Sequence, residues 1–367
     1  MTQHSDAPAP PATEPSLQEF GETNDGDLGT DEARGREGLR AWHRFVGWFL
    51  WLCSLPVLAV LGSRAVPDDG ITPVAQLVPF FTYALAAAVV LLVLAVTARR
   101  QLLSAVLVVC VGAGGFLAGS SFLPGEHAAT GADLTDPRTL RLMTVNALYG
   151  SADAEWIVGT VRAEEVEILA VQELTPELDR ELADAGLGEL LPHQVTGKVE
   201  TGSPAGSGLY SALPLRDERA GESSTFAMPS AVIDAGGLDV RIRLVHPVPP
   251  MPGDTTTWKR ELAGLRQVTH ADTTPQILLG DFNATYDHAS FRDLLGGRFH
   301  DAWREKGVGL ARTWPEGRSL PVLGTRIPAL IPVDHVLVDD SMRVGDVRSR
   351  IVPGSDHRAV LSTVVVR

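Results

Sequence analysis

Three long apolar runs dominate the first third of the chain. They read WHRFVGWFLWLCSLPVLAVLG, VAQLVPFFTYALAAAVVLLVLAV and LLSAVLVVCVGAGGFLAGSSFL, and all lie between residues 42 and 123. Each run holds about 20 residues with almost no charge, the length that a helix needs to cross the apolar core of a bilayer. Three such runs in succession favour membrane spans over the buried helices of a soluble protein. We therefore predict a three-helix membrane anchor over residues 41–123.

Arginines lie mainly on one side of the predicted spans. The stretch before the first run and the turn between the second and third runs carry Arg34, Arg36, Arg40, Arg44, Arg99 and Arg100. The connection between the first two runs has one arginine, Arg64, beside two aspartates. Positive-inside bias places the N-terminus in the cytoplasm. An odd number of spans then puts everything after residue 124 outside, so we expect a multi-pass cell-membrane protein with an extracytoplasmic C-terminal domain.

The N-terminal 40 residues contain almost no large apolar side chains. They carry three Arg against nine Asp and Glu, which predicts a disordered acidic cytoplasmic tail. This stretch lacks the basic start and prompt apolar run of a secretory signal peptide. Cys53 and Cys110 both fall inside predicted spans, where we expect them to pack as small apolar residues.

The pattern changes to that of an α/β domain after a linker over residues 124–137. TLRLMTVNAL alternates apolar and polar residues as a strand does, and VEILAVQEL has the pattern of a buried strand. Between them Trp156, Ile157, Val161 and Glu164 have helical spacing, which predicts a helix over about residues 153–165. The three segments form a β-α-β unit whose strands should be adjacent and parallel.

Polar side chains follow one predicted strand after another. The strand ends carry Asn146, Glu173, His246, Asp281 with Asn283, Asp334, and Asp356 with His357. An Asx-type turn explains any one such end. In layered α/β folds, however, ligands bind where loops converge at strand ends. Six polar ends therefore predict a functional site over residues 138–367.

The residue types at these ends suit metal-assisted phosphate chemistry. Glu173, Asp281 and Asp356 offer anionic oxygens, and Asn146 and Asn283 offer neutral ones. Without cysteine in this region, such a set favours Mg²⁺ or Mn²⁺ over a structural Zn²⁺. The histidines at the strand ends have ordinary pKa values near neutrality, which suits proton transfer.

Seven short motifs carry a family resemblance. TVN, VQEL, GSGLYSALPL, LVHP, GDFNAT, VDHVLV and GSDHRAV occur in that order over residues 138–367. GDFN or SDH alone could arise by chance, but the ordered set resembles the endonuclease/exonuclease/phosphatase superfamily, the DNase-I-like fold, in a membrane-anchored bacterial form. The resemblance implies a four-layer α/β sandwich, two mixed sheets flanked by helices, here preceded by three transmembrane helices. It also implies a metal-dependent phosphoric ester hydrolase.

The resemblance further assigns roles to the strand-end residues. Glu173 is similar to the main metal ligand, supported by Asn146, and Asp356 to a second carboxylate beside the metal. Asp281 and Asn283 resemble the pair that activates the attacking water and holds the phosphate. His357 resembles the catalytic histidine, with Asp334 steadying its charged form. His246 resembles a histidine that contacts the phosphate or protonates the leaving oxygen.

Structural alternatives remain open for several of these residues. Glu173 could be a charge at a helix N-terminus, Asn146 could end its strand in a turn, and His246 could be a surface histidine. Asp153 could join the acidic cluster or cap a helix. Trp314 could stack on a substrate ring, although a buried tryptophan is the simpler interpretation. Ser355, Asp356 and His357 adjoin, but neighbouring residues do not form a triad, and no G-x-S-x-G elbow is present.

Charge bears on the substrate. Residues 124–367 carry 24 Lys and Arg against 34 Asp and Glu, whereas duplex nucleic-acid binders show a basic face. We therefore expect a lipid, nucleotide or small-molecule phosphate ester, and keep a nuclease acting on extracellular DNA or RNA as the alternative. A non-catalytic binding module of the same fold is a further alternative, disfavoured because every matched position is filled. The lipid bilayer is an expected partner, and no obligate protein partner is evident.

Overall fold

The protein, described by a computed structural model, is defined over residues 25–130, 138–221, 223–320 and 325–367. The chain divides into two compact units, Met1–Phe49 and Leu50–Arg367. Helix α1 (Asp25–Ser63) begins within the stretch predicted to be a disordered tail. Residues 25–40 are helical instead, because Ala, Glu, Arg and Leu in DEARGREGLRAW have high helix propensity. Residues 1–24 of the predicted tail lie outside the described residues.

Three helical segments are long and apolar enough to cross a membrane, as the sequence predicts. They are Arg36–Ser63, Val74–Thr97 and Gln101–Phe122. In the second unit the helical elements that follow α1 are α2 (Val74–Leu77), η1 (Val78–Phe80), α3 (Phe81–Thr97), α4 (Gln101–Gly119) and η2 (Ser120–Phe122). Exposed Val, Leu and Phe side chains cover the outer faces of α3 and α4, which suits an apolar environment.

Two six-stranded sheets form the body of the second unit. The first sheet has the order β13-β14-β1-β2-β4-β3. Its strands are β1 (Thr139–Asn146), β2 (Ile168–Gln172), β3 (His193–Gly197), β4 (Ser207–Ser211), β13 (Met342–Ile351) and β14 (Arg358–Val366). Within it β1 and β2 run parallel and the other pairs are antiparallel, which confirms the predicted β-α-β unit.

The second sheet has the order β5-β6-β7-β8-β12-β9, again with one parallel pair, β7 and β8. Its strands are β5 (Arg216–Arg219), β6 (Ser230–Asp234), β7 (Asp239–Val245), β8 (Gln276–Asp281), β9 (Phe299–Asp301) and β12 (Asp334–Asp339). A separate two-stranded ribbon consists of β10 (Ser319–Leu320) and β11 (Thr325–Arg326).

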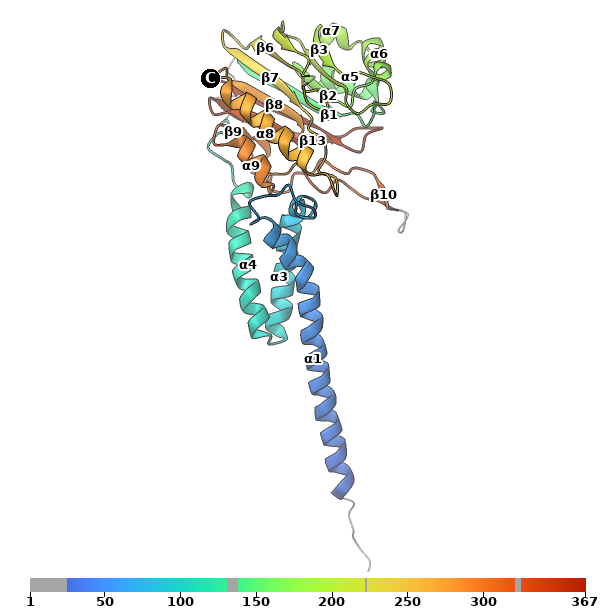
Figure 1. Ribbon diagram of the computed structural model, residues 1–367, viewed down its shortest axis with the longest axis vertical. Helices are drawn as coiled ribbons and strands as arrows, with labels where there is room; N and C mark the ends of the chain where they lie inside the picture. The colour runs from blue at the N-terminus through green and yellow to red at the C-terminus, as the bar shows by residue number, and fades with distance from the viewer. Residues whose placement is uncertain (1–24, 131–137, 222, 321–324) are drawn as a thin grey trace, which may run out of the picture. The chain divides into compact units, whose positions relative to one another are not determined.

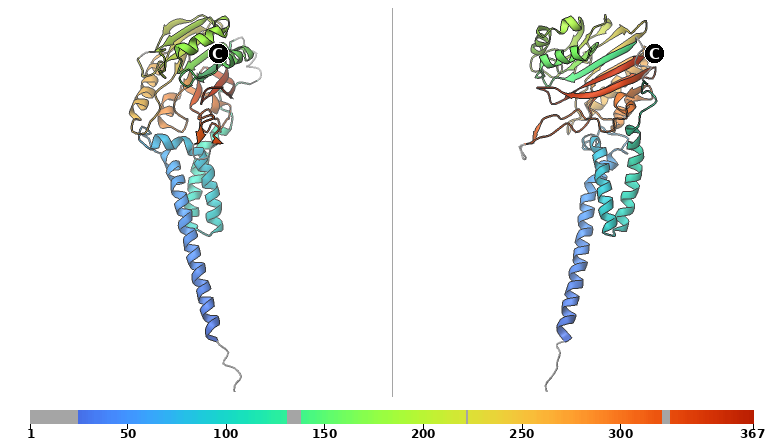
Figure 2. Two further views of the ribbon diagram at one scale, coloured as in Figure 1. Left: turned by 90° about the vertical axis from the view of Figure 1, so that its right-hand side faces the viewer. Right: turned by 180° about the vertical axis from the view of Figure 1, so that it is seen from behind.

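Helices cover the outer faces of both sheets and complete four layers (Figure 1; Figure 2 shows the sheets from behind). The helices of this region are α5 (Ala154–Ala163), α6 (Pro176–Asp184), α7 (Leu187–Leu190), α8 (Thr256–Ala271), α9 (Ala289–Leu295) and α10 (Ala302–Glu305). One apolar cluster lies between the sheets, a second joins α5, α6 and α7 to the first sheet, and a third joins α8 and α9 to the second. This is the predicted four-layer sandwich, hereafter the sandwich.

Strand pairing brings the polar strand ends together. Asp281, at the end of β8, pairs in register with Asp334 at the start of antiparallel β12. Gly280 precedes Asp281 at φ 149°, and a Cβ there would lie 2.1 Å from the Val245 carbonyl oxygen of β7. Only glycine allows this close approach of β7 and β8, so it positions Asp281 beside the end of β7.

Candidate active site

Glu173 follows β2 and lies in the left-handed region at φ 57°. Its Oε1 accepts a hydrogen bond from Asn146 Nδ2 at 3.1 Å, and its Oε2 accepts one from the Tyr149 amide at 2.8 Å. A non-glycine residue in this conformation is held by its surroundings and is typical of functional sites. Helix α6 begins at Pro176 with Thr175 as its N-cap, so Glu173 lies before the helix and outside its first turn. Burial raises the pKa of Glu173 above its usual value.

Asn146 links the two sheets. Besides Glu173, its Nδ2 donates to Asp281 Oδ2 at 3.1 Å, while its Oδ1 accepts from the Leu148 amide at 3.0 Å. The residue therefore presents its amide nitrogen, and not its oxygen, to the carboxylates. In this geometry Asn146 bridges carboxylates on different sheets, and its role as a metal ligand stays a prediction.

Asp281 and Asn283 form a turn after β8 and also belong to the candidate active site. Asp281 Oδ1 accepts from the Asn283 amide at 2.8 Å, which is the Asx turn that the local sequence predicts. Asn283 lies at φ 47° and its Nδ2 donates to the Pro247 carbonyl at 3.0 Å. Burial, opposed by His357 and reinforced by Asp334, raises the pKa of Asp281.

His357 is oriented by a carboxylate on each side. Its Nδ1 lies 3.0 Å from Asp334 Oδ2, and its Nε2 lies 3.8 Å from Asp281 Oδ2 and 4.0 Å from Asp356 Oδ1. Burial favours the neutral ring, but Asp334 and Asp281 together outweigh burial and raise the pKa of His357. The imidazole is thus held in one orientation with Nε2 toward two further carboxylates.

Asp356 is tied to the loop that contains Trp314. Its Oδ2 accepts from Arg318 Nε at 2.7 Å and from Trp314 Nε1 at 3.2 Å. Trp314 is half-buried and lines the pocket described below, so the simpler expectation of a buried tryptophan is wrong. Its ring stays partly exposed because its indole nitrogen is turned toward Asp356.

His246 follows β7 and is 1% exposed, which excludes a surface histidine. Its ring lies against Phe226, with 4.7 Å between the ring centroids. Burial, together with the nearby His357, lowers the pKa of His246 to about 3, so the ring is neutral. Among the described residues its Nδ1 has no hydrogen-bond partner, and neither has Asp334 Oδ1. At the end of a strand beside the pocket, these two atoms are available to a ligand.

A pocket of about 670 Å³ lies over these side chains. Its polar lining contains Glu173, His246, Asp281, Asn283, Asp356 and His357. Asn146 and Asp334 lie immediately behind it through the hydrogen bonds above. The structure therefore brings all the strand-end residues singled out in the sequence into one site, with Trp314 at its edge.

Several pocket residues have no signal in the sequence that we recognised. They include Phe80, Tyr149, Phe226 and Arg318. Tyr149 contributes its backbone amide, which any residue type could supply. Arg318 and Phe226 lie on irregular segments without strand or helix periodicity, so no pattern marks the side that they face.

Two polar residues near the site, Asp153 and His335, have structural roles. Asp153 is the N-cap of α5, where its Oδ1 accepts from the Trp156 amide at 2.9 Å. His335 is buried, with Nε2 3.0 Å from the Ala284 carbonyl oxygen and Nδ1 3.2 Å from Asp301. Neither lines the pocket over the strand ends.

The donor set fits a divalent cation. Asp281, Asp334 and His357 bring ligand atoms within 4.8 Å of one another, and all three side chains are buried. Glu173 and Asp356 add carboxylates that face the same pocket. Oxygen-rich sites with several carboxylates suit Mg²⁺ or Mn²⁺, and a cation would offset the burial of these negative charges.

The sequence from residue 143 to residue 357 matches the Endonuclease/Exonuclease/phosphatase family. Because the match spans more than half of the chain, the chain belongs to this family. Its members are generally metal-dependent phosphoester hydrolases. A comparison with curated proteins finds no significant match.

Solved structures share the fold. D. rerio TDP2 complexed with single-strand DNA product is 13% identical with a TM-score of 0.50, over 62% of this chain and 98% of that chain. An endonuclease/exonuclease/phosphatase from Beutenbergia cavernae is 19% identical with a TM-score of 0.47, over 62% and 72%. A family protein from Leptotrichia buccalis is 14% identical with a TM-score of 0.46, over 61% and 98%. At these identities the likeness concerns the fold alone.

Proposed function

We propose that this protein is a divalent-metal-dependent phosphoesterase that hydrolyses a phosphate ester by in-line attack of water. The observation that carries the proposal is the His357–Asp334 pair, 3.0 Å apart, set beside Asp281 in a pocket with two further carboxylates. Glu173 and Asp356 would hold the cation. A cation bound there would neutralise phosphate charge and stabilise the oxyanion that leaves.

The side chains divide the reaction between them. Asp281, steadied by Asn283 and Asn146, would orient the attacking water and accept its proton. His357, held by Asp334, would stabilise the negative charge that develops on the phosphoryl oxygens. The water oxygen bonds to phosphorus as the bond to the leaving alcohol breaks, and the alcohol oxygen takes up a proton. Neutral His246 suits a hydrogen bond to a phosphate oxygen better than proton donation.

The test uses the purified full chain in detergent with bis-p-nitrophenyl phosphate. We expect hydrolysis that needs added Mg²⁺ or Mn²⁺ and stops with EDTA. Hydrolysis at the same rate in EDTA would contradict the metal requirement, and no hydrolysis under any metal would contradict the enzyme assignment.

The active site would face the extracytoplasmic side. The arginine distribution and the three candidate spans support this orientation. Protease added to intact cells should then digest the sandwich and spare the N-terminal tail. The reverse pattern would contradict the orientation.

Nucleic acid is the second candidate substrate class, since D. rerio TDP2 of similar fold was solved with single-strand DNA product. Among the described pocket residues Arg318 is the one Lys or Arg, which gives little basic surface for a phosphate backbone. We therefore favour a substrate other than long DNA or RNA.

A further inference from the structure

The wall of the active-site pocket is partly built by the membrane anchor. Ala75, Gln76, Pro79 and Phe80 belong to α2 and η1, yet they line the same pocket as Glu173 and His357. Beside them stands the proline-rich loop Pro249–Pro252, which includes Met251. The polar base of the pocket thus has an apolar lip made by two segments far apart in the sequence.

The connection between the first two spans is fastened to the sandwich by specific contacts. Asp69 is buried and accepts from the Ser290 amide at 3.0 Å. The Ala75 carbonyl lies 2.9 Å from His288 Nε2, and Gln76 Nε2 donates to the Pro250 carbonyl at 2.7 Å. Because these buried polar groups of the connection are paired with the sandwich, its place against the pocket is part of the fold.

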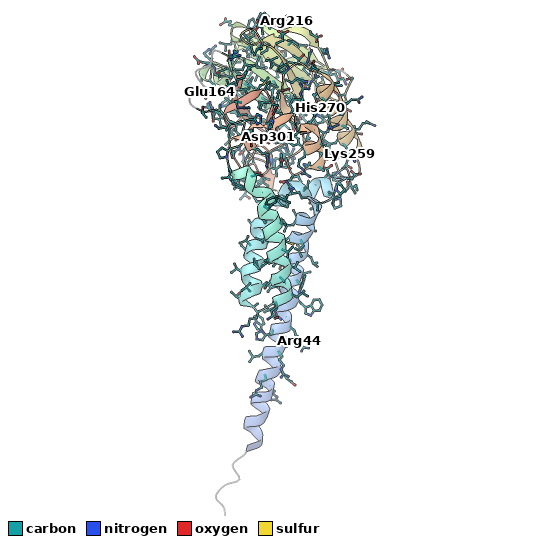
Figure 3. All side chains as sticks on the ribbon, turned by 90° about the vertical axis from the view of Figure 1, so that its left-hand side faces the viewer. Arg44, Glu164, Arg216, Lys259, His270 and Asp301 are labelled. Carbon is teal, nitrogen blue, oxygen red and sulfur yellow. The ribbon has the colours of Figure 1, made fainter. Side chains whose placement is uncertain are left out.

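Salt bridges and a tyrosine extend this attachment on both sides. Arg64 Nε lies 2.6 Å from Asp287, and Lys259 Nζ lies 2.7 Å from Asp68. Lys259 is at the end of the sandwich from which α3 and α4 extend (Figure 3). The Tyr83 hydroxyl, in the first turn of α3, donates to the Leu330 carbonyl at 2.7 Å.

The length of α3 bears on where the lip would lie, because residues 75–80 open the candidate span Val74–Thr97. Helix α3 has 17 residues and begins at Phe81, immediately after Phe80 of the pocket wall. At 1.5 Å per residue it is about 26 Å long, close to the apolar thickness of a bilayer. If α3 spans the membrane, little of its length is spare, so the pocket wall formed by residues 75–80 meets the membrane surface.

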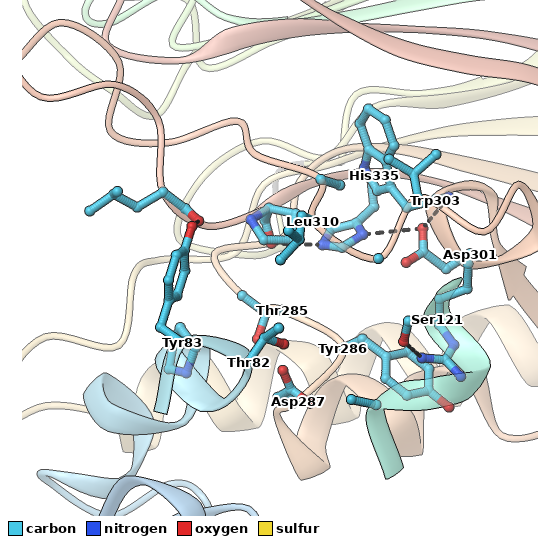
Figure 4. Close-up of a pocket in the computed structure, with 18 residues that line it drawn as sticks. Thr82, Tyr83, Ser121, Thr285, Tyr286, Asp287, Asp301, Trp303, Leu310 and His335 are labelled. Atoms are coloured by element: carbon cyan, nitrogen blue, oxygen red, sulfur yellow. Dashed lines mark hydrogen bonds and ion pairs between the residues drawn. The ribbon is translucent and has the colours of Figure 1, made fainter. Parts of the chain in front are cut away.

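Four of the six large apolar side chains that are exposed on the described sandwich line pockets that the anchor also lines. Six large apolar side chains of the described sandwich are exposed: Tyr149, Met251, Val268, Val308, Leu310 and Ile351. Tyr149 and Met251 line the active-site pocket. Val308 and Leu310 line a second cavity, which Tyr83 and Ser121 of the anchor also line together with Tyr286 (Figure 4). Apolar side chains exposed beside a membrane surface are stabilised by contact with lipid.

We propose that the pocket takes a phosphate ester carried by a membrane lipid. The phosphate would lie over Asp281 and His357, and the lipid would leave the pocket past Phe80 and Met251 toward the bilayer. This inference rests on the proposed phosphoesterase function and names its substrate class. A soluble phosphate ester would gain nothing from an apolar lip that continues into a membrane helix.

The main experiment compares two substrates on the full chain in vesicles of phosphatidylcholine, phosphatidylglycerol and phosphatidylinositol. Release of water-soluble phosphate compounds from the vesicles reports lipid hydrolysis, and bis-p-nitrophenyl phosphate reports the chemistry alone. We expect Met251→Ser and Phe80→Ser to reduce lipid hydrolysis about tenfold more than hydrolysis of the soluble diester. A factor of about ten corresponds to the contribution of roughly one buried apolar side chain to lipid binding. Ile351→Ser, equally exposed on β13 but outside the pocket, is the matched control.

The outcomes separate this inference from the proposed function. Hydrolysis of the soluble diester without any lipid release, or faster hydrolysis of a single-stranded oligonucleotide than of lipid, overturns the inference and leaves the phosphoesterase intact. No hydrolysis of any substrate overturns the phosphoesterase itself.

A second measurement needs no activity. A fluorophore on Met251→Cys, with Cys53 and Cys110 replaced by Ser, should be quenched by lipids spin-labelled near the headgroup. The same fluorophore on Ile351→Cys should not be quenched. Equal quenching at both positions, or none at Met251→Cys, would remove the membrane contact on which the inference depends.

Discussion

Two clusters of histidine and carboxylate occur in the described part of the chain, and they differ in kind. Each brings three ligand atoms within 4.8 Å. The first consists of Asp281, Asp334 and His357 at the strand ends, and the second of His127, His300 and Glu305 beside α10. All side chains of the first are buried, whereas both histidines of the second are partly exposed.

The second cluster satisfies its own hydrogen bonds. The Nε2 atoms of His127 and His300 lie 3.0 and 3.1 Å, respectively, from Asp340 Oδ1. The two imidazole rings stack with 3.5 Å between their centroids. Glu305 Oε2 accepts from the His127 amide at 2.8 Å. The cluster fastens the segment after the third apolar helix to the sandwich.

The first cluster instead leaves polar atoms facing a cavity. Asp334 Oδ1 and the nearby His246 Nδ1 are buried without partners among the described residues. Glu173 and Asn283 have left-handed backbones beside it. Proximity of donor groups therefore does not distinguish a functional site from a structural cluster. Unpartnered polar atoms and left-handed backbone next to a cavity distinguish the two here.

The largest expected effect is that of Glu173→Gln. Without this carboxylate the cation would be held weakly, so hydrolysis of bis-p-nitrophenyl phosphate should fall about a thousandfold or more. Calorimetric titration should show weaker Mg²⁺ binding at an unchanged melting temperature. Glu305→Gln, from the second cluster, is the control and should keep its activity. A Glu173→Gln protein as fast as the wild type would end the metal-centred interpretation.

Asp334→Asn should act on turnover more than on metal binding. The amide keeps the shape of the hydrogen bond to His357 but removes the charge that raises the pKa of His357. We expect kcat to fall by about 10²–10⁴-fold. In the pH–rate profile, the limb that reports the ionisation of His357 should move to lower pH. Asp340→Asn is the matched change in the second cluster. Loss of Mg²⁺ affinity without a change in the pH profile would contradict this role.

His246→Ala sharpens the assignment of the neutral histidine. If His246 binds a phosphate oxygen, activated nitrophenyl esters and esters with poor leaving groups should slow alike, by about 10- to 100-fold. Stronger slowing of the poor leaving groups would assign proton donation to His246 instead. Steady-state rates over a series of leaving groups decide between the two.

The smallest effect concerns stability. The hydrogen bond with Glu305, opposed by burial and aided by Asp340, raises the pKa of His300. A raised histidine pKa stabilises the fold below the ordinary value of about 6.5, and this stabilisation is lost as pH rises through the higher folded value. His300→Gln should therefore cost less than about 1 kcal/mol near neutral or mildly acidic pH and almost nothing in alkali.

Thermal melting of His300→Gln and of the wild type at about pH 6 and about pH 9 measures this difference. Hydrolysis of the soluble diester should be unchanged. A variant that is destabilised more in alkali than in acid would contradict the sign, and a loss of activity would move the second cluster into the catalytic machinery.

The first β-α-β unit and most of the polar site could be predicted from local patterns, whereas the four-layer arrangement was implied by the family resemblance. Alternating apolar and polar residues precede Asn146, and a continuous apolar run precedes Asp281. Both patterns are contained within about ten residues, and strand pairing then brings the two ends together. Asp153 illustrates the limit of this reasoning, because a carboxylate near a strand end equally suits a helix N-cap, which is its place.

The apolar lip could not be predicted in this way. Gln76 and Pro250 are 174 residues apart, and Tyr83 and Leu330 are 247 apart. Their contacts depend on how the first span connection packs on the finished sandwich, which no periodicity within either segment records. The orientation of Asn146 was equally out of reach, since sequence names the amide but not which end faces the carboxylates.

The docked connection between the first two spans also makes substrate choice separable from chemistry. The residues that we propose to cleave the ester come from the sandwich, while part of the lip at residues 75–80 comes from the anchor. A chimera that exchanges only the anchor segment should inherit the substrate preference of the donor and retain the recipient's hydrolytic machinery. A fragment that starts at Thr139 would lack the part of the lip that the anchor supplies. Its substrate preference would therefore differ from that of the full chain.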